Sequence, residues 1–161
     1  MKAIVIGTSL AGKTTLIRQL RSQTSLPISE IDEELTLLND GEYPADFKLK
    51  HEIVTPKVIK KILDLESIIF FTNTNYFSID DLREAKKLGF KIVQLDLSLD
   101  ELIKRNESRM KNEGYDDMGQ WLEGMLLYQA EVKDAGLVGK VISANRPTEI
   151  IAKELTEYIG Q

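Results

Sequence analysis

The sequence contains no cysteine, which excludes disulfide bonds and thiolate metal sites. Its one histidine, His51, lies in a polar stretch with no neighbour for a catalytic dyad, so we expect it to be solvent-exposed or to cap a helix. No apolar run approaches the ~20 residues of a membrane-spanning helix. The chain begins directly with a strand pattern and shows no export signal, so we expect a cytoplasmic protein without membrane contact.

Positive charge is also scarce, with 21 Lys and Arg against 26 Asp and Glu and a net charge of -5. A nucleic-acid interface needs a basic face, so we expect no nucleic-acid partner. The chain of 161 residues is 42% hydrophobic, which is ordinary for a globular protein and enough for one core. We therefore expect a single domain over residues 1–161.

The most informative stretch is the N-terminal one, where the apolar segment 2–6 predicts a buried strand and residues 13–22 predict a helix. Between them the sequence follows the pattern G-x-x-x-x-G-K-T of a phosphate-binding loop. Glycines at both ends of the loop allow successive N–H groups to turn inward around phosphate oxygens. The expected nucleotide-binding residues are Gly7, Thr8, Ser9, Leu10, Ala11, Gly12, Lys13, Thr14 and Thr15.

Two side chains of this loop have distinct expected roles. Lys13 is expected to reach the β- and γ-phosphates of a nucleoside triphosphate, and the hydroxyl of Thr14 to ligate Mg²⁺. The positive end of the following helix points at the same place. The loop thus predicts a bound nucleoside triphosphate but leaves open the reaction that follows.

The rest of the chain alternates between strand and helix patterns. Such alternation predicts a three-layer, doubly wound α/β fold with a five-stranded, mainly parallel sheet. Ligands of such sheets bind at the carboxyl ends of the strands, so we expect the phosphate-binding loop, Asp32, Thr72-Asn73 and Asn145-Arg146 to share one edge. We expect the other strands at residues 26–31, 67–72, 91–97 and 140–142. We expect further helices to begin near Thr55, Ser78, Ser98, residue 117 and residue 148. Residues 32–51 are expected to be less regular.

Three further features resemble the small P-loop kinases of the nucleoside-monophosphate-kinase and shikimate-kinase group, within the adenylate-kinase-like P-loop NTPases. Asp32 follows the second strand, where shikimate-kinase-like enzymes have Asp-x-Asp. Residues 95–105 are similar to the group's fourth strand and the helix that enters its small helical lid, and Asn145-Arg146-Pro147-Thr148 resembles its loop beside the adenine. The resemblance spans nearly the whole chain and is diagnostic of the superfamily rather than of one substrate.

The resemblance implies roles for three arginines. Arg109 is expected to close over the transferring phosphoryl group when a lid near residues 105–120 shuts, and Arg105 to stack on the adenine or reach the phosphates. Arg146 is expected beside the nucleotide. A simpler alternative stays open, in which Arg105 and Arg109 are solvated and pair with Glu101 or Glu113.

Asp32 is the best candidate to activate an acceptor hydroxyl or to hold Mg²⁺ through water, and Glu34 is a candidate acceptor ligand. Alternatively, Asp32 is only the N-cap of a following helix with Glu34 in its first turn.

Departures from the group's pattern narrow the expected reaction. The third strand ends in Thr72-Asn73 without the usual carboxylate, which shifts metal binding to Asp32 or weakens the catalytic interpretation. Leu35 stands where nucleoside-monophosphate kinases carry an arginine, so we expect ATP-dependent phosphorylation of a small molecule at a hydroxyl rather than of a monophosphate. The alternatives are a nucleotide-binding switch or weak NTPase acting through an unknown protein partner and, second, a nucleoside monophosphate kinase.

Overall fold

The computed structural model describes all residues 1–161 and contains one five-stranded sheet. The strands are β1 (Lys2–Gly7), β2 (Ile28–Glu30), β3 (Ile68–Thr72), β4 (Lys91–Asp96) and β5 (Lys140–Ser143), in the order β2-β3-β1-β4-β5. All four strand pairings are parallel. The predicted α/β class with a parallel sheet is therefore confirmed, and the sheet is entirely rather than mainly parallel.

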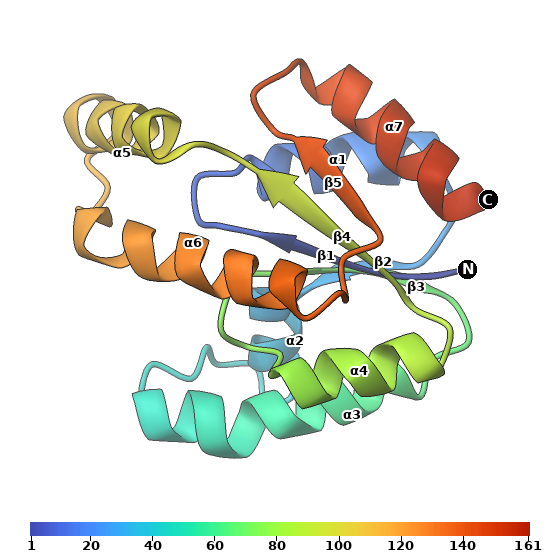
Figure 1. Cartoon of the computed structure of the whole chain (residues 1–161). Coiled ribbons are helices and arrows are strands. Elements are labelled where there is room, and N and C mark those ends of the chain that lie inside the picture. Colours follow the sequence, from blue (N-terminus) through green and yellow to red (C-terminus); the bar gives the residue numbers. More distant parts are fainter.

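Helices cover both faces of this sheet (Figure 1). α1 and α7 lie on one face, whereas α2, α3 and α4 lie on the other. The helices are α1 (Lys13–Gln23), α2 (Ile31–Leu37), the π-helix η1 (Leu49–Val54), α3 (Thr55–Leu63), α4 (Ile79–Lys87), α5 (Leu99–Glu113), α6 (Gly119–Asp134) and α7 (Thr148–Gly160). None of them is both long and apolar enough to cross a membrane.

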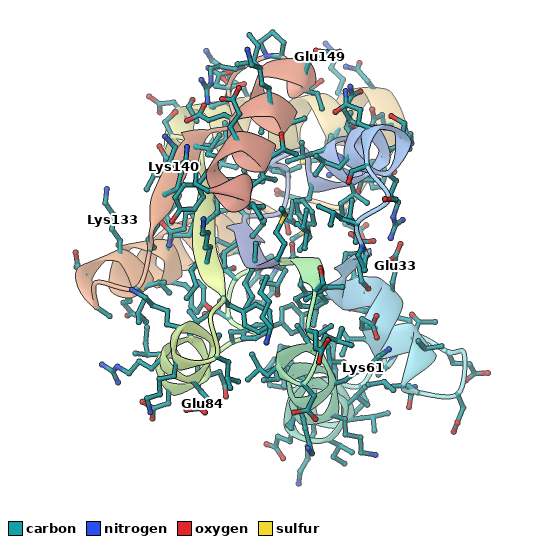
Figure 2. The ribbon with its side chains drawn as sticks, turned by 90° about the vertical axis from the view of Figure 1, so that its right-hand side faces the viewer. Glu33, Lys61, Glu84, Lys133, Lys140 and Glu149 are labelled. Carbon is teal, nitrogen blue, oxygen red and sulfur yellow. The ribbon has the colours of Figure 1, made fainter.

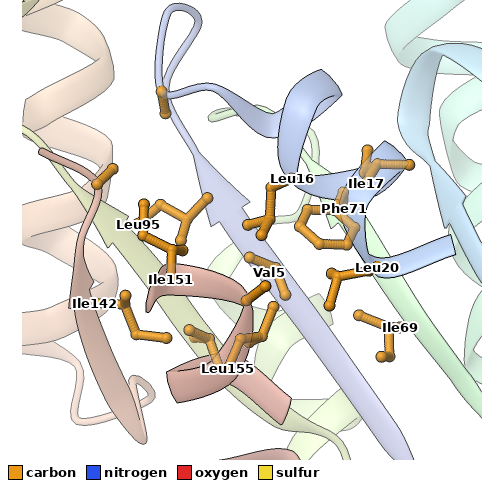
Figure 3. Close-up of a cluster of buried hydrophobic side chains, with 14 of the residues drawn as sticks. Val5, Leu16, Ile17, Leu20, Ile69, Phe71, Leu95, Ile142, Ile151 and Leu155 are labelled. Carbon is orange, nitrogen blue, oxygen red and sulfur yellow. The ribbon is translucent and has the colours of Figure 1, made fainter. Parts of the chain in front are cut away.

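Side chains that alternate along β1 build the two halves of the core. Ala3 and Val5 face the cluster beneath α1 and α7, which Figure 3 shows, whereas Ile4 and Ile6 face the cluster beneath α3 and α4. Successive side chains of a strand point to opposite faces, so a central strand between two helical layers must be apolar throughout. This buried strand holds the start of the phosphate-binding loop in place.

The segment after β2 differs from the sequence-based expectation. β2 is shorter than predicted and ends at Glu30, because Ile31 already begins α2. The supposedly irregular residues 32–51 contain α2 and the start of η1, so the helical region begins before Thr55 rather than at a Thr55 cap. His51 lies inside η1 rather than at one of its caps. It is partly buried, and its ring centroid lies 4.3 Å from that of Phe47 and 5.2 Å from that of Tyr76.

Candidate active site

A cavity of about 520 Å³ lies at the carboxyl edge of the sheet. It joins the phosphate-binding loop, the ends of β2 and β3, and one side of α5, as the parallel topology predicts. Most of the predicted site residues meet here. The lining includes Ser9, Leu10, Gly12, Lys13, Thr14, Thr15, Glu30, Asp32, Asn73, Arg105, Ser108, Arg109 and Glu113.

The backbone of the loop adopts conformations that open it toward this cavity. Gly12 has a φ of 81° and forms the N-cap of α1, in the left-handed region where glycine avoids a steric penalty. Leu10 has a φ of 74°, which is strained for a side chain of its size. At Gly7 the close approach is that of a side chain, because an added Cβ would lie 3.1 Å from Cδ of Lys13. The lysine side chain therefore packs directly over this glycine.

Lys13 is folded back onto the loop that carries it. Its ammonium donates hydrogen bonds to the carbonyl oxygens of Gly7 at 2.9 Å and Thr8 at 2.7 Å. Desolvation lowers the pKa of Lys13 to about 8, although the charges of Asp32 and Glu30 act in the opposite direction. Gly7 and Thr8 do not line the cavity; they contact the lysine through their carbonyl groups.

Two carboxylates face Lys13 from the end of β2. Asp32 lines the cavity from the first turn of α2, and burial is the main cause that raises its pKa. It is not the N-cap of α2, which is Glu30. Glu30 also lines the cavity, and burial followed by repulsion from Glu33 and Asp32 raises its pKa. Glu30 was not among the expected site residues; the available signal was its place as the last residue of β2, at the ligand-binding edge.

The two predicted lid arginines are held differently. Arg109 lines the cavity, pairs with Glu113 at 3.6 Å and lies over the ring of Tyr115 at 4.1 Å. Arg105 pairs with Glu101 at 3.2 Å. Both ion pairs of the simpler alternative are therefore present.

Arg105 does more than pair with its own helix. Its guanidinium also donates to the carbonyl oxygens of Leu10 at 2.9 Å and Ala144 at 3.2 Å. Its N–H groups therefore join the phosphate-binding loop to the loop after β5 and contact protein carbonyls in this conformation.

Arg146 borders a second, smaller cavity of about 220 Å³ on the other side of Arg105. Ala11, Gly12 and Thr15 reach this cavity from the phosphate-binding loop, and Ile151 closes it from α7. The guanidinium of Arg146 donates to Ser143 O at 3.1 Å and pairs with Glu154 at 2.5 Å. The two cavities together offer a polar compartment and a neighbouring, partly apolar one.

Glu34 does not reach the site, so its predicted role as an acceptor ligand is wrong. Its buried carboxylate accepts a hydrogen bond of 2.7 Å from Ser29 Oγ and pairs with Lys61 of α3 at 2.5 Å. This carboxylate attaches α2 to β2 and α3.

The side chains at the site suit a magnesium ion. Mg²⁺ binds proteins through one or two oxygen ligands and keeps waters and substrate phosphates as its others. The hydroxyl of Thr14 and the carboxylates of Glu30 and Asp32 line the same cavity. No group of three or more His, Cys, Asp or Glu side chains is arranged to cage a metal by itself, so substrate oxygens would complete the coordination.

No protein-family model matches the sequence. The fold, however, resembles those of solved kinases over nearly the whole chain. Shikimate kinase from Aquifex aeolicus is 18% identical with a TM-score of 0.69, and the match covers 99% of this chain and 96% of that one.

Two further solved structures show the same likeness. Shikimate kinase from Acinetobacter baumannii, in complex with shikimate, is 15% identical with a TM-score of 0.74, covering 98% of this chain and 92% of that one. A gluconokinase from Sinorhizobium meliloti is 15% identical with a TM-score of 0.58, and the match covers 98% of this chain and 95% of that one. The phosphate-binding loop, the strand order and these likenesses together show that the chain has the fold of the small P-loop kinases.

Proposed function

We propose that the protein transfers the γ-phosphoryl group of ATP to a hydroxyl of a small molecule. The observation that carries this proposal is the single cavity into which Lys13, Asp32 and Arg109 all open. A cation for the phosphates, a base for the acceptor and a cation for the moving group are the parts that phosphoryl transfer requires. The fold shared with shikimate kinase and gluconokinase supports the same reaction class.

The proposed step follows from these positions. Asp32 accepts the proton of the acceptor hydroxyl, whose oxygen forms a bond to the γ-phosphorus. The bond from that phosphorus to the β–γ bridging oxygen breaks, and ADP leaves with the electron pair. Lys13 moves from the carbonyl groups of Gly7 and Thr8 to the phosphates, and Arg109 leaves Glu113 to neutralise charge on the phosphoryl group.

Thr14 and, through water, Asp32 would hold Mg²⁺, which would neutralise negative charge on the phosphates. We propose that the base of the nucleotide occupies the smaller cavity beside Ile151 and Arg146. The phosphate-binding loop lies between this smaller cavity and the carboxylates of the larger one. In this proposal residues 1–161 form one domain, and residues 105–120 form its mobile lid.

One observation favours a second candidate function. Asn73 directly follows β3 and lines the cavity, where an amide replaces the carboxylate that would hold metal-bound water. A protein with weak metal binding would hold its nucleotide without rapid transfer. The second candidate is therefore a nucleotide-dependent switch that acts on a protein partner.

The test is ADP release from Mg-ATP with and without pooled small hydroxyl compounds. The kinase proposal expects a rate that rises at least about a hundredfold with an acceptor, within the range of positioning effects. A slow rate that no acceptor changes supports the switch. Lys13→Met abolishes turnover in either case, and Lys104→Met, the same change at an exposed lysine of α5, serves as the control.

A further inference from the structure

The two ends of the cavity differ in charge. The phosphate-binding end has the cations Lys13, Arg105 and Arg109. The end where β2 and β3 finish has the carboxylates of Glu30 and Asp32 and the amide of Asn73, and neither strand nor α2 adds a cation to the lining. With the nucleotide on the loop, the acceptor has to enter between these carboxylates and the γ-phosphate.

The basic residues around the acceptor end are already engaged. Lys61 pairs with Glu34 at 2.5 Å, and Arg21 pairs with Glu33 at 2.7 Å while also donating to Ile28 O. No arginine occurs in the sequence between Arg21 and Arg83. Planar, bidentate recognition of a carboxylate or phosphate depends on arginine. The acceptor end therefore lacks the group that would recognise an anionic acceptor.

Besides Lys13, which belongs to the phosphate-binding end, Lys50 is a further cation near this end. Its ammonium lies 3.4 Å from the hydroxyl of Tyr43 and over that ring at 5.5 Å. Its charge reaches Asp32 and partly opposes the effect of burial on the pKa of that carboxyl. Lys50 does not line the cavity, so it tunes Asp32 from outside and contributes no direct acceptor contact.

Glu30, like Asp32, is a cavity carboxylate without an ion-pair partner. None of the ion pairs in the structure includes Glu30, although Glu33 and Glu34 on the following helix are both paired. Its side chain is half-buried at the cavity wall, close enough to Asp32 for their charges to repel, and the charges of Lys13 and Arg21 reach it without forming an ion pair. A charged group enclosed by a ligand is costly unless the ligand supplies an opposite charge. An acceptor with an ammonium group would meet that requirement.

We propose that the acceptor carries an ammonium group beside its reacting hydroxyl and bears no negative charge, as amino alcohols and amino sugars do. The hydroxyl faces Asp32 and the γ-phosphate, and the ammonium is bound by Glu30. This inference rests on the proposed kinase function and specifies its substrate class. It separates the protein from enzymes whose acceptors are hydroxy acids or sugar phosphates.

The experiment sorts acceptors by charge while keeping their skeleton constant. ADP release from Mg-ATP is measured with sets that contain an amine, a neutral compound and an anion, in that order. One set is serinol, glycerol and glycerate, and another is glucosamine, glucose and glucuronate. Larger pools of amino alcohols, polyols and hydroxy acids follow. We expect kcat/KM to be at least about tenfold higher for amines than for their neutral counterparts, because a hydrogen bond to a charged group is worth about that factor. The anionic compounds are expected to give no acceleration.

The outcomes separate this inference from the proposed function. Acceleration by hydroxy acids or by neutral polyols alone overturns the inference and leaves the kinase proposal standing. A rate that no pool changes overturns both.

A substitution of Glu30 tests whether this residue causes the preference for amine acceptors. Glu30→Gln is expected to raise KM for the best amine at least about tenfold and to change KM for the matching neutral compound less than about twofold. Glu66→Gln is the matched control, because Glu66 is exposed between α3 and β3, does not line the cavity and forms no ion pair. It should leave the preference for amines unchanged.

The same variant separates acceptor binding from metal binding. If Glu30 serves the metal instead, Glu30→Gln raises the Mg²⁺ concentration for half-maximal rate equally with both acceptors. That result overturns the inference. Glu30→Asp, which keeps the charge, is expected to restore part of the preference, and thermal unfolding of each variant checks that the fold is intact.

Discussion

Nη1 of Arg105 lies 2.9 Å from the carbonyl oxygen of Leu10, a residue 95 positions earlier in the sequence. Leu10 is the strained residue of the phosphate-binding loop, with a φ of 74°. A residue held in a sparsely populated conformation persists because its surroundings enforce it. The guanidinium thus holds the Leu10 carbonyl group in its observed direction, and we expect the loop N–H groups to depend on this contact for their orientation toward phosphate.

Arg105→Met is therefore expected to weaken nucleotide binding by about tenfold, the value of one hydrogen bond from a charged group. Isothermal titration with a non-hydrolysable ATP analogue measures this change. Lys104→Met on the exposed side of the same helix should leave the affinity unaltered. Unchanged affinity in Arg105→Met would show that the loop holds its conformation without the arginine.

The stability of the free protein should depend on Lys13. Its folded pKa of about 8 is below the ordinary value of 10.5, so the unfolded chain binds more protons between these pH values. The contribution of Lys13 to the free energy of unfolding therefore rises with pH between about pH 8 and pH 10.5. Below about pH 8 this contribution is lower than above pH 10.5 by on the order of 3 kcal/mol. Lys13→Met removes this dependence and should be at least as stable as the wild type at pH 7. Urea unfolding at pH 7 and pH 10 measures both effects, and equal pH dependence in the two proteins would contradict them.

The protonation of Asp32 should determine how activity falls at low pH. Burial raises the pKa of its carboxyl, so the base form is lost at a higher pH than for an ordinary aspartate. Activity is expected to fall as pH drops through that raised pKa. Asp32→Asn should lower kcat by about a hundredfold or more, the scale of general-base catalysis, with nucleotide affinity retained. Steady-state kinetics from pH 4 to 9 test this, and a variant with wild-type kcat would remove Asp32 from the chemistry.

Asn106 is expected to anchor the base of the predicted lid. Its buried side chain donates to Asp117 at 2.7 Å and accepts from the N–H of Met118 at 2.9 Å, which joins α5 to the start of α6. Asn106→Ala leaves these groups without their partner and should destabilise the protein by about 1–3 kcal/mol. Hydrogen exchange should become faster over residues 107–118. Exchange that is faster everywhere, rather than in this segment, would argue against a local anchor.

Glu34→Ala is expected to act on stability and leave acceptor binding alone. The substitution leaves Lys61 and Ser29 without their partner, which should cost about 1–3 kcal/mol, below the value for a fully buried pair because Lys61 is partly exposed. Urea unfolding measures the loss, and KM for the acceptor should be unchanged. An altered KM with unaltered stability would restore the sequence-based expectation. Figure 2 labels Lys61 on α3, beside α2.

The sequence predicted those parts of the protein that depend on local chemistry. The strand before Gly7, the loop and α1 follow from one contiguous pattern. α4 begins after Ser78 as expected, and Ser78 forms a reciprocal capping box with Asp81 there. The gathering of Asp32 and Asn73 beside the loop follows from parallel topology alone, without knowledge of side-chain contacts.

What the sequence did not predict depends on long-range partners. Whether Glu34 faces a ligand or a lysine is decided by Lys61, which lies 27 residues away on α3. The bond from Arg105 to Leu10 spans 95 residues, so helical spacing alone indicated only the pair with Glu101. β2 has only three residues, too few for a periodic signal to show that Glu30 faces the cavity.

The central claim is that the phosphoryl group leaves ATP for a second molecule. The most direct measurement is the stoichiometry of products, with ADP, inorganic phosphate and phosphorylated acceptor quantified in one reaction by ³¹P resonance and mass spectrometry. The account predicts one phosphorylated acceptor for each ADP and almost no inorganic phosphate, with both products lost in Lys13→Met. Equal amounts of ADP and inorganic phosphate with every acceptor supplied would contradict it.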